Sequence, residues 1–175
     1  MKREATLSPC GSYRFDMTRT VERDCTCERC LVNRARYSLR DPFPFVLWVL
    51  CNPSIANAEI DDPTERRCWG FTSSWGYSKM VMVNTNPHRS TDPKLQRMPD
   101  ELTAVKNHAV LALYASNAAL IVCAWGGGAN HILGNQTRCL LERWGDLHHL
   151  GLTKAGTPKH PLYLSKETKP QLWTR

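Results

Sequence analysis

The feature that most constrains the fold is an apolar run from Phe45 to Cys51, which ends abruptly at Asn52-Pro53-Ser54. The run is too short for a core helix and rich in residues that favour strands, so it predicts a strand buried on both faces. Proline ends strand pairing, which leaves Asn52 at the carboxyl end of this strand. Open α/β sheets bind their ligands at that edge, so the sequence predicts a site there.

The same pattern, an apolar run followed by a polar turn, recurs three more times along the chain. The expected strands cover residues 45–51, 79–84, 119–124 and 148–152. The expected helices between and after them cover residues 64–76, 100–117 and about 130–144. This alternation predicts a three-layer α/β/α fold with a mostly parallel, four-stranded central sheet. Residues 13–17 alternate in polarity and are expected to form an edge strand.

The expected helix at 100–117 has apolar residues close to helical spacing, which predicts that this stripe packs against the sheet. The residues of the stripe are Leu102, Val105, Ala109, Val110, Leu113 and Tyr114.

The length of 175 residues suits one domain with a proper core, so we expect residues 1–175 to form a single unit. No apolar run approaches the roughly 20 residues of a membrane helix, and the first residues lack a signal-peptide core. We therefore expect a cytoplasmic protein with no membrane contact, and a monomer.

The net charge of +7 is unevenly distributed. Residues 1–40 hold nine Lys and Arg against five acids, and residues 151–175 hold five against one. Such basic ends suit a polyanionic partner if they meet on one face. The alternative is a basic surface that only aids solubility.

Three of the eight cysteines, Cys25, Cys27 and Cys30, lie within six residues of one another. That stretch is too polar to bury itself, and a metal bound by thiolates would stabilise it. With Cys10 as the fourth ligand, residues 10–40 are interpreted as an inserted Cys-rich zinc knuckle. An iron–sulfur cluster and a metal-free loop are the alternatives. The other cysteines, which are expected in the core, are Cys51, Cys68, Cys123 and Cys139.

Several polar residues at the expected strand ends are candidates for chemistry, and each also has a structural explanation. Asn52 and Asn84 are either functional amides or turn residues that satisfy the backbone. Asp61 and Asp62 are either catalytic carboxylates or the cap of the helix that follows. His160 stands in a context too polar for a core histidine, which favours function.

The motifs together resemble a small family of phage and bacterial proteins known mainly as a domain of unknown function, over most of residues 13–173. The motifs that carry this resemblance are Asn52-Pro53-Ser54, Asp61-Asp62-Pro63-Thr64, Trp75-Gly-Tyr, Val83-Asn-Thr, Ala124-Trp-Gly and residues 151–164.

The order of the motifs also resembles, more distantly, the uracil-DNA glycosylase superfamily. In that comparison Asn52-Pro53 matches the turn after the first core strand, and Asn84 matches the amide that reads the pyrimidine. Trp125-Gly126 matches a Leu-Gly strand end, and His160-Pro161 matches a His-Pro loop near the carboxyl end. The chain departs from the superfamily at Leu162-Tyr163, which replaces a Ser-Pro pair, and at Cys51, where small residues are usual.

This resemblance implies an enzyme that hydrolyses the N-glycosidic bond of uracil or a modified pyrimidine in DNA. Asn52 would position water, His160 would donate to the leaving base, and Asp61 or Asp62 would act as the base. Aromatic residues that could stack on an extruded base are Phe71, Trp75, Tyr77 and Trp125. Basic residues that could contact DNA are Arg89, Lys154 and Lys159. The alternatives are a zinc-knuckle nucleic-acid binder without catalysis and a hydrolase of free nucleotides or nucleosides.

Overall fold

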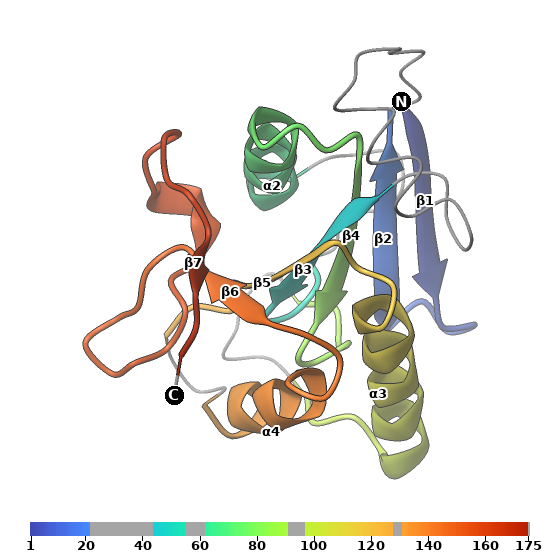
Figure 1. The fold of residues 1–175 in the computed structure, drawn as a ribbon. Helices are drawn as coiled ribbons and strands as arrows, with labels where there is room; N and C mark the ends of the chain where they lie inside the picture. Colours follow the sequence, from blue (N-terminus) through green and yellow to red (C-terminus); the bar gives the residue numbers. More distant parts are fainter. Residues whose placement is uncertain (22–43, 55–61, 91–96, 128–130, 175) are drawn as a thin grey trace.

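The protein folds around one seven-stranded sheet with helices on both faces (Figure 1). The computed structural model describes residues 1–21, 44–54, 62–90, 97–127 and 131–174. The strands are β1 (Lys2–Leu7), β2 (Arg14–Thr20), β3 (Phe45–Leu50), β4 (Lys79–Asn84), β5 (Leu120–Cys123), β6 (Leu147–His149) and β7 (Gln171–Leu172). The helices are α2 (Pro63–Ser74), α3 (Glu101–Ala115), α4 (His131–Leu141) and the 3₁₀ turn η2 (Pro161–Tyr163).

The centre of the sheet is parallel, as the alternation of runs predicted. The strand order is β1-β2-β4-β3-β5-β6-β7, and β4, β3, β5 and β6 are mutually parallel. Three antiparallel strands widen this centre: β2 and β1 on one side, and β7 on the other. Residues 14–20 therefore form an inner strand and not the predicted edge strand, because β1 pairs with β2 along its outer side.

The connections place a topological switch point in the middle of the sheet. The chain leaves β3 through α2 to β4 on one side, and then crosses through α3 to β5 on the other side of β3. Figure 1 shows α2 on one face of the sheet, and α3 and α4 on the opposite face. Ligands of open α/β sheets bind beyond the carboxyl ends of the strands at such a point, here between β3 and β5.

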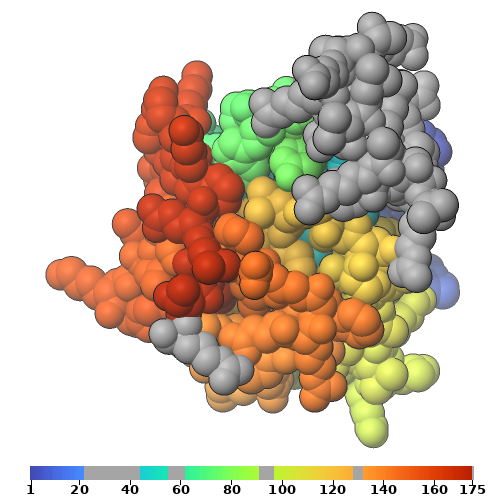
Figure 2. Space-filling view, viewed as in Figure 1, coloured from blue at the N-terminus to red at the C-terminus, as the bar shows by residue number. Residues whose placement is uncertain are grey.

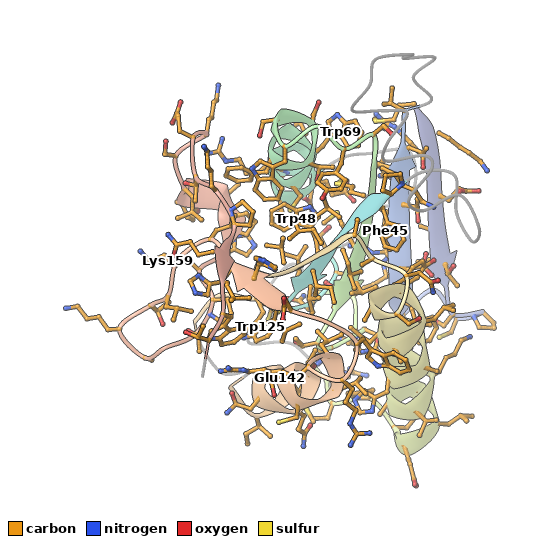
Figure 3. The ribbon with its side chains drawn as sticks, viewed as in Figure 1. Phe45, Trp48, Trp69, Trp125, Glu142 and Lys159 are labelled. Carbon is orange, nitrogen blue, oxygen red and sulfur yellow. The ribbon has the colours of Figure 1, made fainter. Side chains whose placement is uncertain are left out.

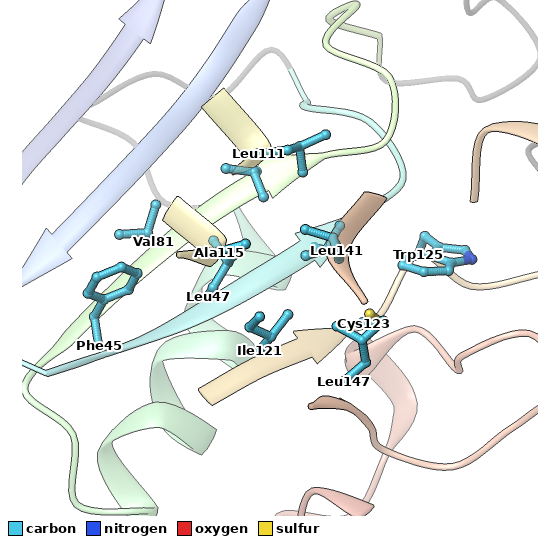
Figure 4. Packing of buried hydrophobic residues seen from close by; sticks show 12 residues of the cluster. Phe45, Leu47, Val81, Leu111, Ala115, Ile121, Cys123, Trp125, Leu141 and Leu147 are labelled. Atoms are coloured by element: carbon cyan, nitrogen blue, oxygen red, sulfur yellow. The ribbon is translucent and has the colours of Figure 1, made fainter. Parts of the chain in front are cut away.

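Two apolar layers hold the helices to the sheet. On the α2 face, Trp48 and its neighbours on β3 pack against Cys68 and Phe71. On the opposite face, twelve buried residues join the strands to α3 and α4 (Figure 4). The cysteine prediction holds for Cys68 and Cys123, which are buried. It fails for Cys139, which is exposed, while Cys51 is half-buried against the second layer.

Helix α3 turns only part of the predicted apolar stripe toward the sheet. Leu102, Val105 and Leu113 are 79 %, 58 % and 61 % exposed. The buried residues of α3 are Asn107, Leu111 and Ala115. Val110 and Tyr114 of the predicted stripe do pack against this layer, whereas Leu102, Val105, Ala109 and Leu113 are exposed, so the prediction that the whole stripe packs on the sheet is wrong only in part.

The two basic ends of the chain do not meet at the sheet. Strand β1, near the amino terminus, forms one edge, and β7, near the carboxyl terminus, forms the other. Figure 1 shows the termini on opposite sides of the molecule. The basic residues of β1 and of the carboxyl-terminal tail therefore do not form one surface through their strands. Among the described residues, no helix has the length and apolar character of a membrane span.

Candidate functional site

The carboxyl ends of β3, β4 and β5 bring three sequence-predicted positions to one edge of the sheet. Side chains alternate between faces along a strand. Leu50, Met82 and Ala124 all belong to the layer that α2 covers. Asn84, the last residue of β4, continues this alternation on the α2 face, while Asn52 and Gly126 lie in the turns just after β3 and β5, at the switch point.

The side-chain amide of Asn84 is buried at the carboxyl end of β4. The residue is 1 % exposed, and neither Nδ2 nor Oδ1 has a hydrogen-bond partner within the described residues. The side chains of the next two residues form hydrogen bonds within the turn: Thr85 donates to the Cys51 carbonyl, and Asn86 accepts from the His88 N–H. The turn therefore does not use the Asn84 amide. A buried, unpaired amide costs free energy that a bound ligand or water would recover.

The side chain of Asn52, by contrast, is partly used by the backbone. Its Nδ2 donates to the Ser90 carbonyl at 2.7 Å and to the Pro53 carbonyl at 3.3 Å. These bonds tie the turn after β3 to the segment that follows β4, as the structural explanation of Asn52 requires. Its Oδ1 accepts no hydrogen bond within the described residues and retains its capacity to accept one.

Asp62 caps α2, which is the structural role that the sequence left open for it. Its Oδ1 accepts from the Glu65 N–H at 2.8 Å, while Glu65 Oε2 accepts from the Asp62 N–H at 3.1 Å. This reciprocal capping box fixes the carboxylate at the start of the helix. The second oxygen, Oδ2, accepts from Ser54 Oγ at 2.7 Å. Asp61 lies outside the described residues.

Beneath Asp62 lies a buried group of charges that the sequence did not predict. Glu65, 1 % exposed, lies 3.8 Å from Arg14 Nη1 and 3.5 Å from Arg19 Nη2 on β2. Burial raises the pKa of Glu65 to about 7, although both guanidinium groups favour the ionised form. Burial also lowers the pKa of Arg14 to about 10. An irregularity in the β1–β2 pairing, opposite Thr6 and Leu7, accompanies this arrangement. No local pattern in the sequence indicates it.

His160 lies at the same edge, against the end of β5. A Cβ on Gly126 would lie 3.4 Å from His160 Cβ. Gly126 also has a positive φ of 78°, so both the close packing and the backbone conformation favour glycine here. His160 begins η2, and its Nδ1 accepts from the Leu162 N–H at 3.4 Å. The neutral ring then carries its proton on Nε2. Burial lowers the pKa of His160, and the negative charge of nearby Asp62 opposes that shift.

The predicted stacking aromatics do not gather at this edge. Phe71 is 2 % exposed, and its ring packs in a cluster with Trp48 and Trp75, at centroid distances of 6.1 and 5.6 Å. Trp75 and Tyr77 follow α2 at the opposite end of the strands, where β4 begins.

Trp125 lies on the opposite face of the sheet from α2. It packs against Trp173 at 5.6 Å in the layer beneath α4. Figure 3 shows Trp48 on the α2 side and Trp125 on the α4 side. Tyr163, which no sequence motif pointed to as a stacking residue, is 89 % exposed on η2, three residues from His160.

The basic candidates differ in their surroundings. Lys154 and Lys159 are exposed in the segment that leads to His160, and Figure 3 shows Lys159 at the periphery of the molecule. Arg89 is half-buried, and its guanidinium donates to the Gly11 carbonyl at 2.9 Å and to the Ser54 carbonyl at 3.5 Å. Arg89 therefore joins the β1–β2 turn to the turn after β3.

The proposed metal knuckle falls mostly on residues that the structure does not describe. Cys25, Cys27 and Cys30 lie outside the described residues. Cys10 is exposed in the β1–β2 turn, where hydrogen bonds from Ser8 and Ser12 lower its pKa to about 7. A thiol with a lowered pKa suits a metal ligand. Within the described ranges, no three His, Cys, Asp or Glu side chains are grouped to hold a metal ion.

The fold and the site define an α/β protein with a parallel-centred sheet and a polar site at the topological switch point. The chain belongs to the family described as "Protein of unknown function (DUF1643)", which matches residues 36–162. No curated protein and no solved structure matches the sequence. The match leaves out β1 and β2, and with them Arg14 and Arg19.

Proposed function

We propose that this protein hydrolyses the N-glycosidic bond of uracil or a modified pyrimidine in DNA. The observation that carries the proposal is the buried amide of Asn84 at the switch point, which has no hydrogen-bond partner in the part of the chain that the structure describes. One amide can donate to one atom of a pyrimidine edge and accept from another, which is the pairing such a base presents. The motif resemblance to the uracil-DNA glycosylase superfamily, and the parallel sheet that it implies, agree with this proposal.

The other side chains at this edge suit the remaining requirements of the reaction. Water adds to C1′ of the sugar and gives up a proton, the bond from C1′ to the base nitrogen breaks, and the electron pair leaves with the base, which takes up a proton. Asn52 Oδ1 would hold the water, and His160 Nε2–H would stabilise the charge that gathers on the departing base. The Asp62 carboxylate, held by its cap, would stabilise the positive charge that develops on the sugar.

The surface beside His160 suits a nucleic-acid backbone and an unstacked base. Lys154 and Lys159, exposed in the segment that leads to His160, offer charge to phosphates, and Tyr163 offers an exposed ring. We also propose that Cys10 binds zinc together with Cys25, Cys27 and Cys30. Such a zinc site would be structural, because four thiolates leave no open position for substrate.

The test uses DNA duplexes and single strands that carry uracil, 5-hydroxymethyluracil, 5-hydroxymethylcytosine or glucosylated bases, followed by alkali to cleave abasic sites. We expect strand cleavage with at least one of these bases, and a loss of at least 100-fold in N84A. The matched control is N117A, which changes an asparagine at the opposite end of the sheet, just before β5. If micromolar protein forms no abasic site in any substrate, the proposal is rejected.

One observation favours a second function, a nucleic-acid binder without catalysis. Both oxygens of Asp62 already accept hydrogen bonds, from Glu65 N–H and Ser54 Oγ, so the carboxylate is committed to structure. A binder of this kind would show salt-dependent affinity that survives D62N and N52A and weakens when the knuckle cysteines are replaced. The same assay with free nucleosides and nucleotides separates the DNA glycosylase and the nucleic-acid binder from a hydrolase of small molecules, which alone would cleave the free compounds.

A further inference from the structure

We infer that Arg67 is a positioning residue for His160, because its guanidinium holds both ends of the turn that His160 begins. Arg67 Nε donates to the Pro161 carbonyl at 3.4 Å, and Arg67 Nη2 donates to the Leu164 carbonyl. The same guanidinium lies 4.8 Å from the centroid of the Phe71 ring. The side chain is thus stacked on the core of α2 and bonded to a segment 97 residues further along the chain.

The turn needs such support because its own hydrogen bonds are few. η2 is three residues long and is closed by a bond of 3.3 Å from the Leu164 N–H to the Pro161 carbonyl. Short 3₁₀ turns have poor internal hydrogen-bond geometry. Figure 2 shows the carboxyl-terminal segment directly beside α2, and η2 and α2 are in contact. Arg67 is the side chain of α2 that donates hydrogen bonds to carbonyl groups of this turn.

The consequence is that one helix sets the position of two groups of the candidate site. Asp62 caps the first turn of α2, and Arg67, five residues later, fixes the segment that carries His160. The relative placement of carboxylate and imidazole then depends on a rigid helix and not on a flexible loop. A lysine could not reproduce this, because its ammonium is a point charge without the planar fork of arginine. The role in catalysis rests on the proposed function, but the positioning does not.

The experiment compares R67M with R66M, which removes the same charge from the adjacent, exposed residue of the same helix. Amide hydrogen exchange by NMR reports the turn at Leu162 and Leu164. In R67M we expect exchange at these amides at least tenfold faster, with amides of β3 and β5 unchanged. We also expect the imidazole titration of His160 to move up, because burial is the larger influence that lowers its pKa. R66M should behave as the wild type.

Two outcomes would overturn the inference. One is that R67M and R66M give the same exchange at Leu162 and Leu164 and the same His160 titration. The other is that exchange accelerates equally throughout the sheet, which would make Arg67 a residue of general stability. R67K keeps the charge and the long stem, so it decides the matter if R67M does not fold. We expect R67K to shift both readouts in the same direction by less, and wild-type readouts in R67K would overturn the inference.

These readouts do not require activity, so they separate this inference from the proposed function. If DNA cleavage is observed, R67M should lower kcat at least tenfold while KM changes little, because His160 is misplaced and the basic surface remains. If wild-type protein cleaves no substrate, the proposed function fails, and the NMR comparison still decides whether Arg67 positions His160.

Discussion

Ser54 Oγ donates a hydrogen bond of 2.7 Å to Asp62 Oδ2, which joins the turn after β3 directly to the first residue of the α2 cap. Asp62 therefore has a structural role, in the cap and with Ser54, and an electrostatic role, through its charge on His160. The two roles can be separated because asparagine caps helices about as well as aspartate but carries no charge.

D62N should keep the cap and lower the pKa of His160. The free energy of unfolding should change by less than about 1 kcal/mol, since the cap is kept. The pKa of His160 should fall, because the carboxylate that opposes the effect of burial is gone. NMR titration of the imidazole measures the shift, with D62A as the variant that also loses the cap. An unchanged titration in D62N would show that the two groups do not interact.

N84A and N86A should differ in how much unfolding free energy they lose. Asn86 donates to the Arg97 carbonyl at 3.1 Å and accepts from the His88 N–H at 2.9 Å, so N86A should destabilise the protein by about 1–3 kcal/mol. Asn84 has no such partners among the described residues, so N84A should cost clearly less than N86A, while DNA cleavage is lost. Urea unfolding of both variants measures the difference. Equal losses of stability would mean that the Asn84 amide is structurally satisfied.

H160Q should lose less unfolding free energy than the wild type as the pH falls into the acidic range. The folded pKa of His160 is lowered, so the folded state binds fewer protons than the unfolded state below the ordinary value of about 6.5. The contribution of His160 is then fully present above that pH and is lost as the pH falls through it. Unfolding free energies of wild type and H160Q between pH 8 and 5 should converge or cross as the pH falls. Parallel curves would contradict the shift.

L111A and L113A test which face of α3 is inside. Leu111 is fully buried in the layer between α3 and the sheet, so L111A should cost about 2–5 kcal/mol of unfolding free energy. Leu113, two residues later, is 61 % exposed, so L113A should cost less than about 0.5 kcal/mol of unfolding free energy. Chemical denaturation of the two variants decides between the observed face and the one that the apolar spacing predicted.

G134A should destabilise the protein although alanine is the better helix former. A Cβ at Gly134 in α4 would lie 2.7 Å from Trp125 Nε1, so the indole or the helix must move. Gly70 in α2 provides the control, since nothing lies within 4 Å of a Cβ built there. G70A should stabilise by up to about 1 kcal/mol, the usual helix preference for alanine over glycine. Thermal unfolding of the two variants should therefore shift in opposite directions.

The parallel centre of the sheet could be predicted because its strands are apolar on both faces and end in polar turns. Strands β1 and β7 could not, because β1 is mostly exposed and polar and β7 has only two residues. The face of α3 was predicted only in part, for a specific reason. Asn107 is buried because its Nδ2 donates to the Asn84 carbonyl at 3.0 Å, and a pattern of apolar residues contains no information about such a bond.

At the candidate site, the sequence by itself determined what depends on near neighbours: the end of β4 at Asn84, the turn at Asn52 just after β3, and the Asp62 cap, whose partner Glu65 is three residues away. Tertiary structure alone decided that Glu65 meets Arg14 and Arg19, that His160 lies against Gly126, and that Arg67 holds Leu164. Each of these contacts joins residues more than thirty positions apart in the chain. Local propensity and spacing act over one or two turns, so only the packing of whole elements could bring them together.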